Sequence, residues 1–265
     1  MALWLVATPI GTLGDLSPRA QEVLASADAI AAEDTRTARK LLAATGLRAP
    51  ELLALHGHNE SEIGDRVAER ARDEEIVLVS EAGTPGISDP GATVVSAAHR
   101  LGVPVRSVPG PSALAAALAA TGFPAVPSTF LGFASRKGRS GWARAALERG
   151  ETVVVFEAPS RVVDLLGRMA ALQPEREACL CRELSKAFEE VRRDTLAALA
   201  TDLGTRDAIK GECVLVIGPG QPLRPVSPTL EGTSLKDVAK VLAGRWRVTR
   251  REAYQQLLKW EPKDR

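Results

Sequence analysis

The sequence predicts an α/β protein with two α/β domains and a small C-terminal helical appendage. Short apolar runs alternate with amphipathic segments of about 10–15 residues, which is typical of βαβ units that build a parallel sheet. Loops rich in glycine, proline and acidic or hydroxyl residues directly follow several of these runs. A proline-rich stretch then separates a basic, helical C-terminal segment from the rest of the chain.

Composition sets the broad class. The chain has 265 residues, of which 45% are hydrophobic and 25% charged, which suits a globular protein of one large or two medium domains. Because its net charge is only +1, any basic surface that could bind nucleic acid must be confined to one part of the protein. Three cysteines are too few for a disulfide framework and suit a reducing cytoplasm. No apolar run approaches the ~20 residues that span a membrane, so we expect a cytoplasmic protein without a membrane partner.

The first half, expected to be a domain of residues 1–122, alternates strands and helices regularly. Ser17-Pro18, for example, supplies an N-cap and a first-turn proline. The expected strands are 3–7, 28–32, 52–55, 76–80 and 103–108, and the intervening helices end near 25, 46, 73, 101 and 120. Ligands of such sheets bind beyond the carboxyl ends of the strands. The loops at these ends hold most of the glycine, proline, acidic and hydroxyl residues that stand out in this half.

The turn-rich stretch 121–128 marks the expected start of a second domain, residues 123–220. Its connections are shorter, so we expect a mixed sheet rather than an all-parallel one. The expected strands are 129–133, 152–156, 178–182 and 213–217, and the expected helices end near 148, 172 and 203.

The C-terminal segment, residues 221–265, is expected to be a linker followed by two short helices, 234–243 and 249–259. From Ser234 onward it carries nine basic and four acidic residues, an excess of five positive charges. Trp246 lies between two arginines. A basic helical appendage of this kind indicates an RNA contact, with a solubilising tail or a dimer arm as the alternatives.

The loop 80–91 stands out within the first half. It follows a buried apolar strand and holds three glycines and two prolines. Glycines let backbone N–H groups approach a ligand closely, and the prolines stiffen the loop. An ordinary strand-to-helix connection is the alternative on glycine content alone.

Seven motifs share one order with a known family. They are Val6-Ala-Thr-Pro-Ile-Gly-Thr-Leu-Gly-Asp15, Ala32-Glu-Asp-Thr-Arg36, His56-x-His-Asn-Glu60, Glu81-Ala-Gly-Thr-Pro-Gly-Ile-Ser-Asp-Pro-Gly91, Pro109-Gly-Pro-Ser-Ala113, Glu157-x-Pro-x-Arg161 and Arg182-Glu-Leu-Ser-Lys186. Over about residues 3–218 the chain resembles the ribosomal small-subunit methyltransferase I family, the RNA-methylating branch of the tetrapyrrole-methylase superfamily. Glu81, Ser160 and Gly57 depart from the usual family pattern without changing the assignment.

The resemblance implies two α/β domains of the tetrapyrrole-methylase type with S-adenosylmethionine in the cleft between them, usually in a homodimer. It implies 2′-O-methylation of a cytidine ribose in the decoding region of 16S ribosomal RNA, with the 30S subunit as the expected partner. The matching cofactor-binding residues are Pro9, Ala82, Gly83, Thr84, Ile87, Ser112, Ala113 and Phe156. Within the loop, residues 82–88 are expected to hold the cofactor and Asp89-Pro90-Gly91 to start the next helix.

A ribose hydroxyl is a poor nucleophile, so a general base is expected. The acid–base candidates are Glu33, Asp34, His58, Glu60, Asp89, Glu157 and Glu183, of which we favour Glu157 and Glu183 as catalytic. The expected RNA-binding residues are Arg36, His58, Arg161, Arg182, Lys186, Arg247, Arg250 and Arg251. Helix capping is an alternative for Glu33 and Asp34, and a cross-domain salt bridge for Arg182 and Glu183. His56 and His58 lack a third ligand, so no metal is expected.

Three rival functions are weighed against the RNA methyltransferase. A methylase of a tetrapyrrole precursor is the nearest rival, and the basic appendage argues against it. A non-catalytic RNA-binding ribosome-assembly factor is the second. A nicotinamide dehydrogenase is disfavoured, because no G-x-G-x-x-G follows the first strand.

Overall fold

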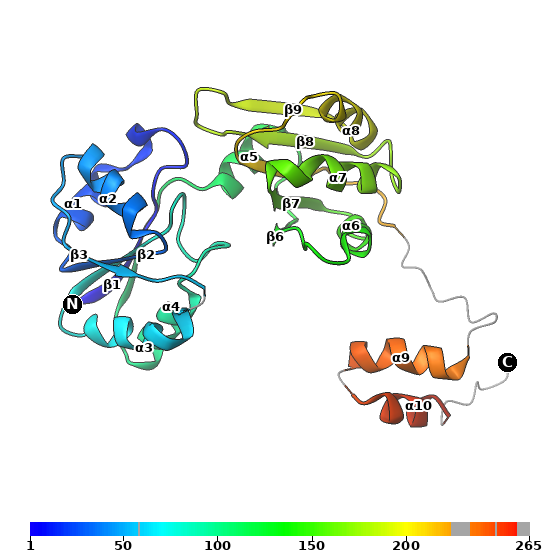
Figure 1. Ribbon diagram of the computed structural model, residues 1–265, viewed down its shortest axis with the longest axis horizontal. Coiled ribbons are helices and arrows are strands. Elements are labelled where there is room, and N and C mark those ends of the chain that lie inside the picture. Colours follow the sequence, from blue (N-terminus) through cyan, green and yellow to red (C-terminus); the bar gives the residue numbers. More distant parts are fainter. Residues whose placement is uncertain (58, 224–233, 247, 259–265) are drawn as a thin grey trace. The chain divides into compact units, whose positions relative to one another are not determined.

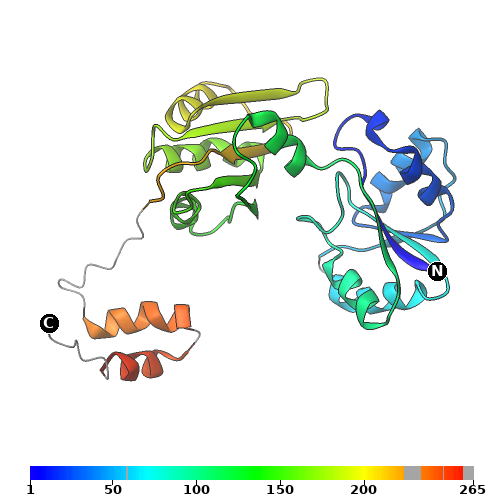
Figure 2. The same ribbon diagram turned by 180° about the vertical axis from the view of Figure 1, so that it is seen from behind.

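The computed structural model describes residues 1–57, 59–223, 234–246 and 248–258. The chain forms two compact units, Met1–Pro222 and Leu223–Arg265 (Figures 1 and 2). The first unit holds two sheets of five strands each, which confirms the predicted α/β class. Within the described ranges, no helix is long and apolar enough to cross a membrane.

The first sheet is entirely parallel. Its strands are β1 (Ala2–Val6), β2 (Ala29–Ala32), β3 (Glu51–Ala54), β4 (Glu75–Val79) and β5 (Val105–Val108), in the order β3-β2-β4-β1-β5. All five therefore end at one edge, and the loops after the central strands β1 and β4 are neighbours there. Ligands of open α/β sheets bind at this edge.

Helices cover both faces of this sheet. The helices α1 (Pro18–Ala25) and α2 (Thr35–Ala44) cover one face. Their residues Leu24 and Leu42 pack in one cluster with the strand residues Ile30 and Val77. The helices α3 (Glu60–Arg70) and α4 (Ala92–Arg100) pack their buried alanines and valines against the other face. The central strands are consequently apolar on both sides, which explains their unbroken hydrophobic runs.

The second sheet is mixed, as expected. Its strands are β6 (Ser128–Phe133), β7 (Thr152–Glu157), β8 (Glu177–Arg182), β9 (Glu190–Thr195) and β10 (Cys213–Ile217), in the order β6-β7-β10-β8-β9. Only β6 and β7 run parallel, and the other pairs are antiparallel. Strand β9 was not predicted, because it is a polar edge strand whose charged residues hide the β pattern. Cys179 and Cys181 are buried strand residues, as expected.

Helix α5 (Ala113–Thr121) follows the first sheet in sequence but packs on the second. Its Ala117 joins the cluster of Val154, Cys179 and Val214. The other face of that sheet is covered by α6 (Arg139–Leu147), α7 (Pro159–Ala170) and α8 (Leu196–Gly204) (Figures 1 and 2). Helix α5 thus connects the two sheets, and the domain boundary expected at residue 122 stays a prediction.

The second unit contains two helices, α9 (Leu235–Trp246) and α10 (Arg250–Leu258), close to the predicted ranges. Ala239 and Ala253 are buried where the two helices pack. Thr249 and Glu252 form a reciprocal capping box at the start of α10, because each accepts a hydrogen bond from the other's backbone N–H.

Candidate active site

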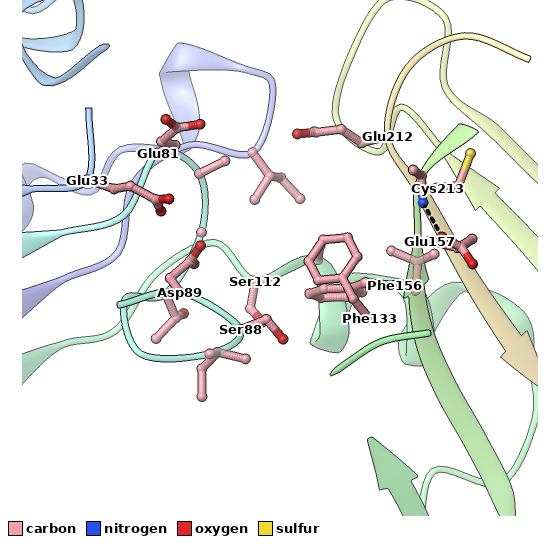
Figure 3. Close-up of a pocket in the computed structure, with 18 of the residues that line it drawn as sticks. Glu33, Glu81, Ser88, Asp89, Ser112, Phe133, Phe156, Glu157, Glu212 and Cys213 are labelled. Atoms are coloured by element: carbon pink, nitrogen blue, oxygen red, sulfur yellow. Dashed lines mark hydrogen bonds between the residues drawn. The ribbon is translucent and has the colours of Figure 1, made fainter. Parts of the chain in front are cut away.

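A cavity of about 420 Å³ lies at the carboxyl ends of the strands of the first sheet (Figure 3). Its other wall is formed by the ends of β6 and β7 and the start of β10 in the second sheet. Its volume is typical of small-molecule sites, roughly 300–1,000 Å³. Loops of the first sheet contribute Ile10, Glu33, Glu81, Ala82, Gly83, Thr84, Ile87, Ser88, Asp89, Pro90, Ser112 and Ala113. The second sheet contributes Phe133, Phe156, Glu157, Ala158, Pro159, Glu212, Cys213 and Val214.

Seven of the eight expected cofactor-binding residues line this cavity. The exception is Pro9, which lines a neighbouring hollow of about 280 Å³ between the loop after β1 and helix α2. The loop after β4 therefore lies at the cavity wall, whereas Pro9 lies one residue before the cavity residue Ile10.

The loop after β4 is fixed to the loop after β1. Thr8 and Gly83 exchange two backbone hydrogen bonds of 2.8 and 3.0 Å, and the Ser80 hydroxyl donates to the Gly83 carbonyl at 2.9 Å. Gly83 has a φ of +86°, a conformation that favours glycine, and a Cβ there would lie 3.4 Å from Ile10 Cγ2. These contacts hold the loop in one conformation, so it can bind a ligand without first being ordered.

The start of α5 also faces the cavity. Its N-cap residue, Ser112, makes no side-chain capping hydrogen bond, and both Ser112 and Ala113 line the cavity wall. The first N–H groups of a helix have no intrahelical partner and carry a partial positive charge. This end of α5 can therefore bind an anionic group such as a carboxylate.

Three carboxylates of the first sheet, Glu33, Glu81 and Asp89, surround one side of the cavity (Figure 3). Glu33 and Glu81 are exposed, whereas Asp89 is partly buried. Burial, followed by the nearby charges of Glu33, Glu81 and Glu212, raises the pKa of Asp89 to about 6. No described residue makes a hydrogen bond or ion pair to the Asp89 carboxylate. An unpaired carboxylate whose pKa is raised in this way can accept a proton from a neighbouring group.

The segment Asp89-Pro90-Gly91 was expected to start the following helix; Gly91 is indeed its N-cap, but Asp89 lies outside the helix and lines the cavity. Helix α4 begins at Ala92, and its first amides are capped from elsewhere: Glu60 accepts 2.8 Å hydrogen bonds from the N–H groups of Gly91 and Thr93. The Asp89 side chain takes no part in this cap and lines the cavity. Glu60, one of the acid–base candidates, thus has a capping role.

The paired acids Glu33 and Asp34 have different environments. Asp34 is the N-cap of α2 and accepts a 2.8 Å hydrogen bond from the Arg36 N–H, which confirms helix capping for this residue. Its carboxylate also pairs with the Arg36 guanidinium at 2.7 Å. Glu33 makes no such cap and lines the cavity instead.

Glu157, a favoured catalytic residue, ends β7 with its carboxylate fully buried. The carboxylate lies 2.9 Å from both the Arg139 and the Arg161 guanidinium and accepts a 2.8 Å hydrogen bond from the Ala158 N–H. Glu157 Oε1 accepts hydrogen bonds from the Ala158 N–H and Arg161 Nε, whereas Oε2 pairs with Arg139 and accepts a hydrogen bond from no described residue. This geometry favours a structural role at the cavity wall, and the catalytic assignment stays a prediction.

Glu183, the other favoured residue, is not part of the cavity wall. Its carboxylate lies 2.8 Å from Lys186 Nζ and accepts a hydrogen bond from the Glu212 N–H, and these two contacts lower its pKa. Arg182 pairs with Glu190 of β9 at 2.9 Å. Both ion pairs lie within the second half of the chain, so the alternative of a cross-domain salt bridge is wrong for these residues.

A different contact joins the two sides of the cavity. Ser185 accepts a 3.0 Å hydrogen bond from the Thr12 N–H, and its hydroxyl donates to Asp15 at 2.6 Å. Thr12 is the N-cap of the short 3₁₀ turn η1 (Leu13–Asp15) after β1, and Asp15 is its last residue. A Cβ at Gly11 would overlap the Lys186 side chain and approach the Ser185 backbone to 2.9 Å. Glycine at position 11 therefore permits this close approach.

The expected RNA-binding residues are dispersed. Arg36 is largely exposed, whereas Arg161, Arg182 and Lys186 are engaged in the ion pairs above. Arg250 and Arg251 are exposed at the start of α10. His58 and Arg247 lie outside the described residues.

Among the cavity residues that sequence reasoning missed are Phe133, Glu212, Cys213 and Val214, and it also missed Arg139, the ion-pair partner of Glu157. Glu212 precedes β10, which runs antiparallel to β7, so Cys213 pairs with Glu157 at the cavity edge. The direction of β10 is not encoded in its own residues. Phe133 had a weak signal, an aromatic residue at a strand end just before a basic loop.

Comparisons with known proteins agree with this architecture. Residues 2–200 match the family model for Tetrapyrrole (Corrin/Porphyrin) Methylases. The chain is 42% identical over 248 residues to a Ribosomal RNA small subunit methyltransferase I of Xylella fastidiosa, covering 92% of this chain and 86% of that protein. It is 40% identical over 280 residues to the protein of the same name from Pseudomonas aeruginosa, covering 98% of each.

Solved structures share the fold at low identity. A diphthine synthase has a TM-score of 0.64 at 18% identity, covering 82% of this chain and 90% of its own. A Thermus thermophilus uroporphyrin-III C-methyltransferase complexed with S-adenosylhomocysteine has a TM-score of 0.56 at 21% identity, covering 82% and 97%. These likenesses support the fold of the first unit.

Proposed function

Because the chain belongs to the ribosomal RNA small subunit methyltransferase I family, we propose that it transfers a methyl group from S-adenosylmethionine to the 2′-hydroxyl of a cytidine in 16S ribosomal RNA near the decoding centre. The observation that carries the proposal is the cavity between the two sheets. It combines a rigid glycine loop, an open helix N-terminus and aromatic residues with an unpaired carboxylate, Asp89.

The cavity residues fit the methyl donor. Backbone groups of Ala82, Gly83 and Thr84 would hold it, the start of α5 would bind its carboxylate, and Phe156 would pack against its adenine. The surrounding acidic side chains favour a positively charged ligand. When bound, S-adenosylmethionine supplies a methyl group on a sulfonium, which is already activated for in-line displacement. The protein's main task is then to position the two reactants, a contribution of up to ~7–11 kcal/mol.

We assign proton removal to Asp89. Its carboxylate would accept the proton of the ribose 2′-hydroxyl as the oxygen bonds to the methyl carbon and the sulfur–methyl bond breaks. A base is most effective when its pKa lies near the working pH, and burial brings the pKa of Asp89 to about 6. Glu157 would position Arg139 and Arg161 at the cavity wall.

The expected acceptor is 16S ribosomal RNA within the 30S subunit, and the expected enzyme is a cytoplasmic homodimer. Transfer of tritium from labelled S-adenosylmethionine to 30S subunits, to naked 16S RNA and to uroporphyrinogen tests the acceptor. Nuclease digestion of the product should yield labelled 2′-O-methylcytidine. Label on uroporphyrinogen alone would overturn the RNA assignment, and label on neither would indicate a non-catalytic assembly factor.

The helical unit is expected to contribute to RNA affinity through its basic residues. Replacing Arg250 and Arg251 together by Gln should weaken 30S binding and reduce the slope of log K against log salt by about 1.4–1.8. Cofactor affinity should stay unchanged, since both arginines lie outside the cavity. Filter binding over a range of salt concentrations measures both quantities.

The matched control for this variant also removes two positive charges, but from the first unit instead of the helical unit. Arg66 and Arg72 are exposed near helix α3, and replacing both by Gln should leave the salt dependence close to that of the unaltered protein. Equal slopes for the two double variants would show that the appendage does not contact RNA.

A further inference from the structure

Phe133 is an exposed aromatic residue at the wall of the cavity. Its side chain is 56% exposed, although a Phe at the end of a strand would ordinarily be covered. The ring contacts Phe156 edge to face, with centroids 5.6 Å apart and an interplanar angle of 72° (Figure 3). Phe133 is therefore held at a fixed angle while much of its surface stays open to solvent.

A local irregularity of β6 places Phe133 there. Residues three apart on a regular strand point to opposite faces, yet both Phe130 and Phe133 contact Phe156. The register shifts between these two residues, and Gly132 has a φ of +63°. A Cβ at Gly132 would lie 3.3 Å from the Ser88 hydroxyl, on the loop that follows β4. The irregularity thus directs the Phe133 ring toward the cavity, as β-bulges beside active sites do.

Two cations follow Phe133 at three and four residues along the chain. Arg136 and Lys137 are exposed, and no described residue forms an ion pair or hydrogen bond with either side chain. They differ in this respect from Arg139, which is nearly buried and binds Glu157 and Asp164. An exposed ring followed within four residues by unpaired cations has the composition of sites that bind single-stranded nucleic acid, where bases stack on aromatic rings and cations contact phosphates.

We propose that Phe133 is a stacking platform for an unpaired base of the RNA substrate, next to the cavity, with Arg136 and Lys137 contacting the adjoining phosphates. The proposal rests on the proposed function and adds the surface that positions the nucleotide. Stacking on Phe133 would hold the ribose near Asp89 without reading the identity of the base. The cofactor would be bound by other residues of the cavity.

The test replaces Phe133 by Ala and by Trp in the full chain. Affinity for 30S subunits is measured by filter binding with saturating S-adenosylhomocysteine, and methyl transfer is measured at saturating cofactor. We expect F133A to weaken 30S binding and kcat/KM by about 5- to 150-fold, the range for loss of one stacked base. F133W retains an aromatic face and should stay within about threefold of the unaltered protein.

Phe188 provides the matched control, because it is 76% exposed and is not part of the cavity wall. F188A should bind 30S subunits normally, and all three variants should bind S-adenosylhomocysteine with unchanged affinity in calorimetry. Equal 30S affinity for F133A and F188A would overturn the proposal. A parallel loss of S-adenosylhomocysteine affinity in F133A would also overturn it, because Phe133 would then be a cofactor residue.

The two proposals fail in distinguishable ways. If the unaltered protein binds 30S subunits but transfers no methyl group to them, the proposed activity fails while the stacking role is still tested by affinity. If the unaltered protein methylates 30S subunits and F133A does so equally well, only the stacking role fails. No binding of the unaltered protein to 30S subunits would overturn both.

Discussion

Replacing Asp89 by Asn is expected to lower kcat for methyl transfer by about 10²–10⁴-fold, the usual contribution of a general base. Asparagine has nearly the same shape but cannot accept the proton of the ribose hydroxyl. Affinity for S-adenosylhomocysteine should change little, since the amide can occupy the same position. Single-turnover rates with 30S subunits, together with calorimetry of the cofactor product, measure both quantities.

The dependence on pH gives a second test of Asp89. The base must be ionised, so kcat/KM should rise with pH and level off above the Asp89 pKa of about 6. Replacing Glu33 by Gln removes a nearby negative charge, which favours the ionised form and lowers this pKa. The E33Q profile should therefore shift to lower pH, whereas D89N should lose this pH-dependent rise.

Two results would contradict the role of Asp89. A D89N variant with normal kcat and weakened cofactor affinity would show that Asp89 binds the methyl donor. A pH profile that stays the same in D89N would assign the titrating group to another residue.

Replacing Glu157 by Gln is expected to reduce the free energy of unfolding by about 3–5 kcal/mol, the usual cost of breaking a buried ion pair. The Glu157 carboxylate is fully buried, and the Arg139 side chain is only 10% exposed. The variant would leave the two guanidiniums of Arg139 and Arg161 close together without a balancing charge. Urea-induced unfolding followed by circular dichroism measures the loss.

Asp65 provides the control for Glu157. It also pairs with an arginine, Arg100, but both side chains are more than half exposed. D65N should therefore cost about 1 kcal/mol or less. If E157Q unfolded normally and instead lost methyl transfer, Glu157 would be the catalytic residue that the sequence favoured, and the structural role argued from its arginine contacts would be wrong.

Much of the fold could be read from periodicity. Regular alternation of apolar strands and amphipathic helices predicted the first sheet, because strands buried on both faces have continuous hydrophobic runs. Strand β9 was not predicted, because an edge strand carries exposed charged residues and lacks a continuous hydrophobic run. Helix α5 was recognised as a helix, but its packing on the second sheet depends on tertiary contacts of Ala117 that its sequence does not encode.

Part of the candidate site could likewise be predicted from the sequence, and part of it could not. The loop 80–91 could be identified from the sequence, because its glycines and prolines directly follow a buried strand and match a family motif. Glu157 and Glu183 could be ranked only by charge and position in a motif. Their arginine and lysine partners became apparent in three dimensions, and these partners distinguish a restrained carboxylate from a free one.

The sequence by itself determined the α/β class, the family and the position of the glycine-rich loop 80–91, since these follow from local pattern and motif order. The tertiary structure decided that Asp89 is more buried than the neighbouring cavity acids Glu33 and Glu81. Glu60 at the start of α3 caps α4, Asp89 faces the cavity, and partial burial raises the pKa of Asp89. It also decided that β10 runs antiparallel to β7, which brings Glu212 to the cavity edge. Strand direction and long-range capping depend on contacts between distant segments, which no local pattern specifies.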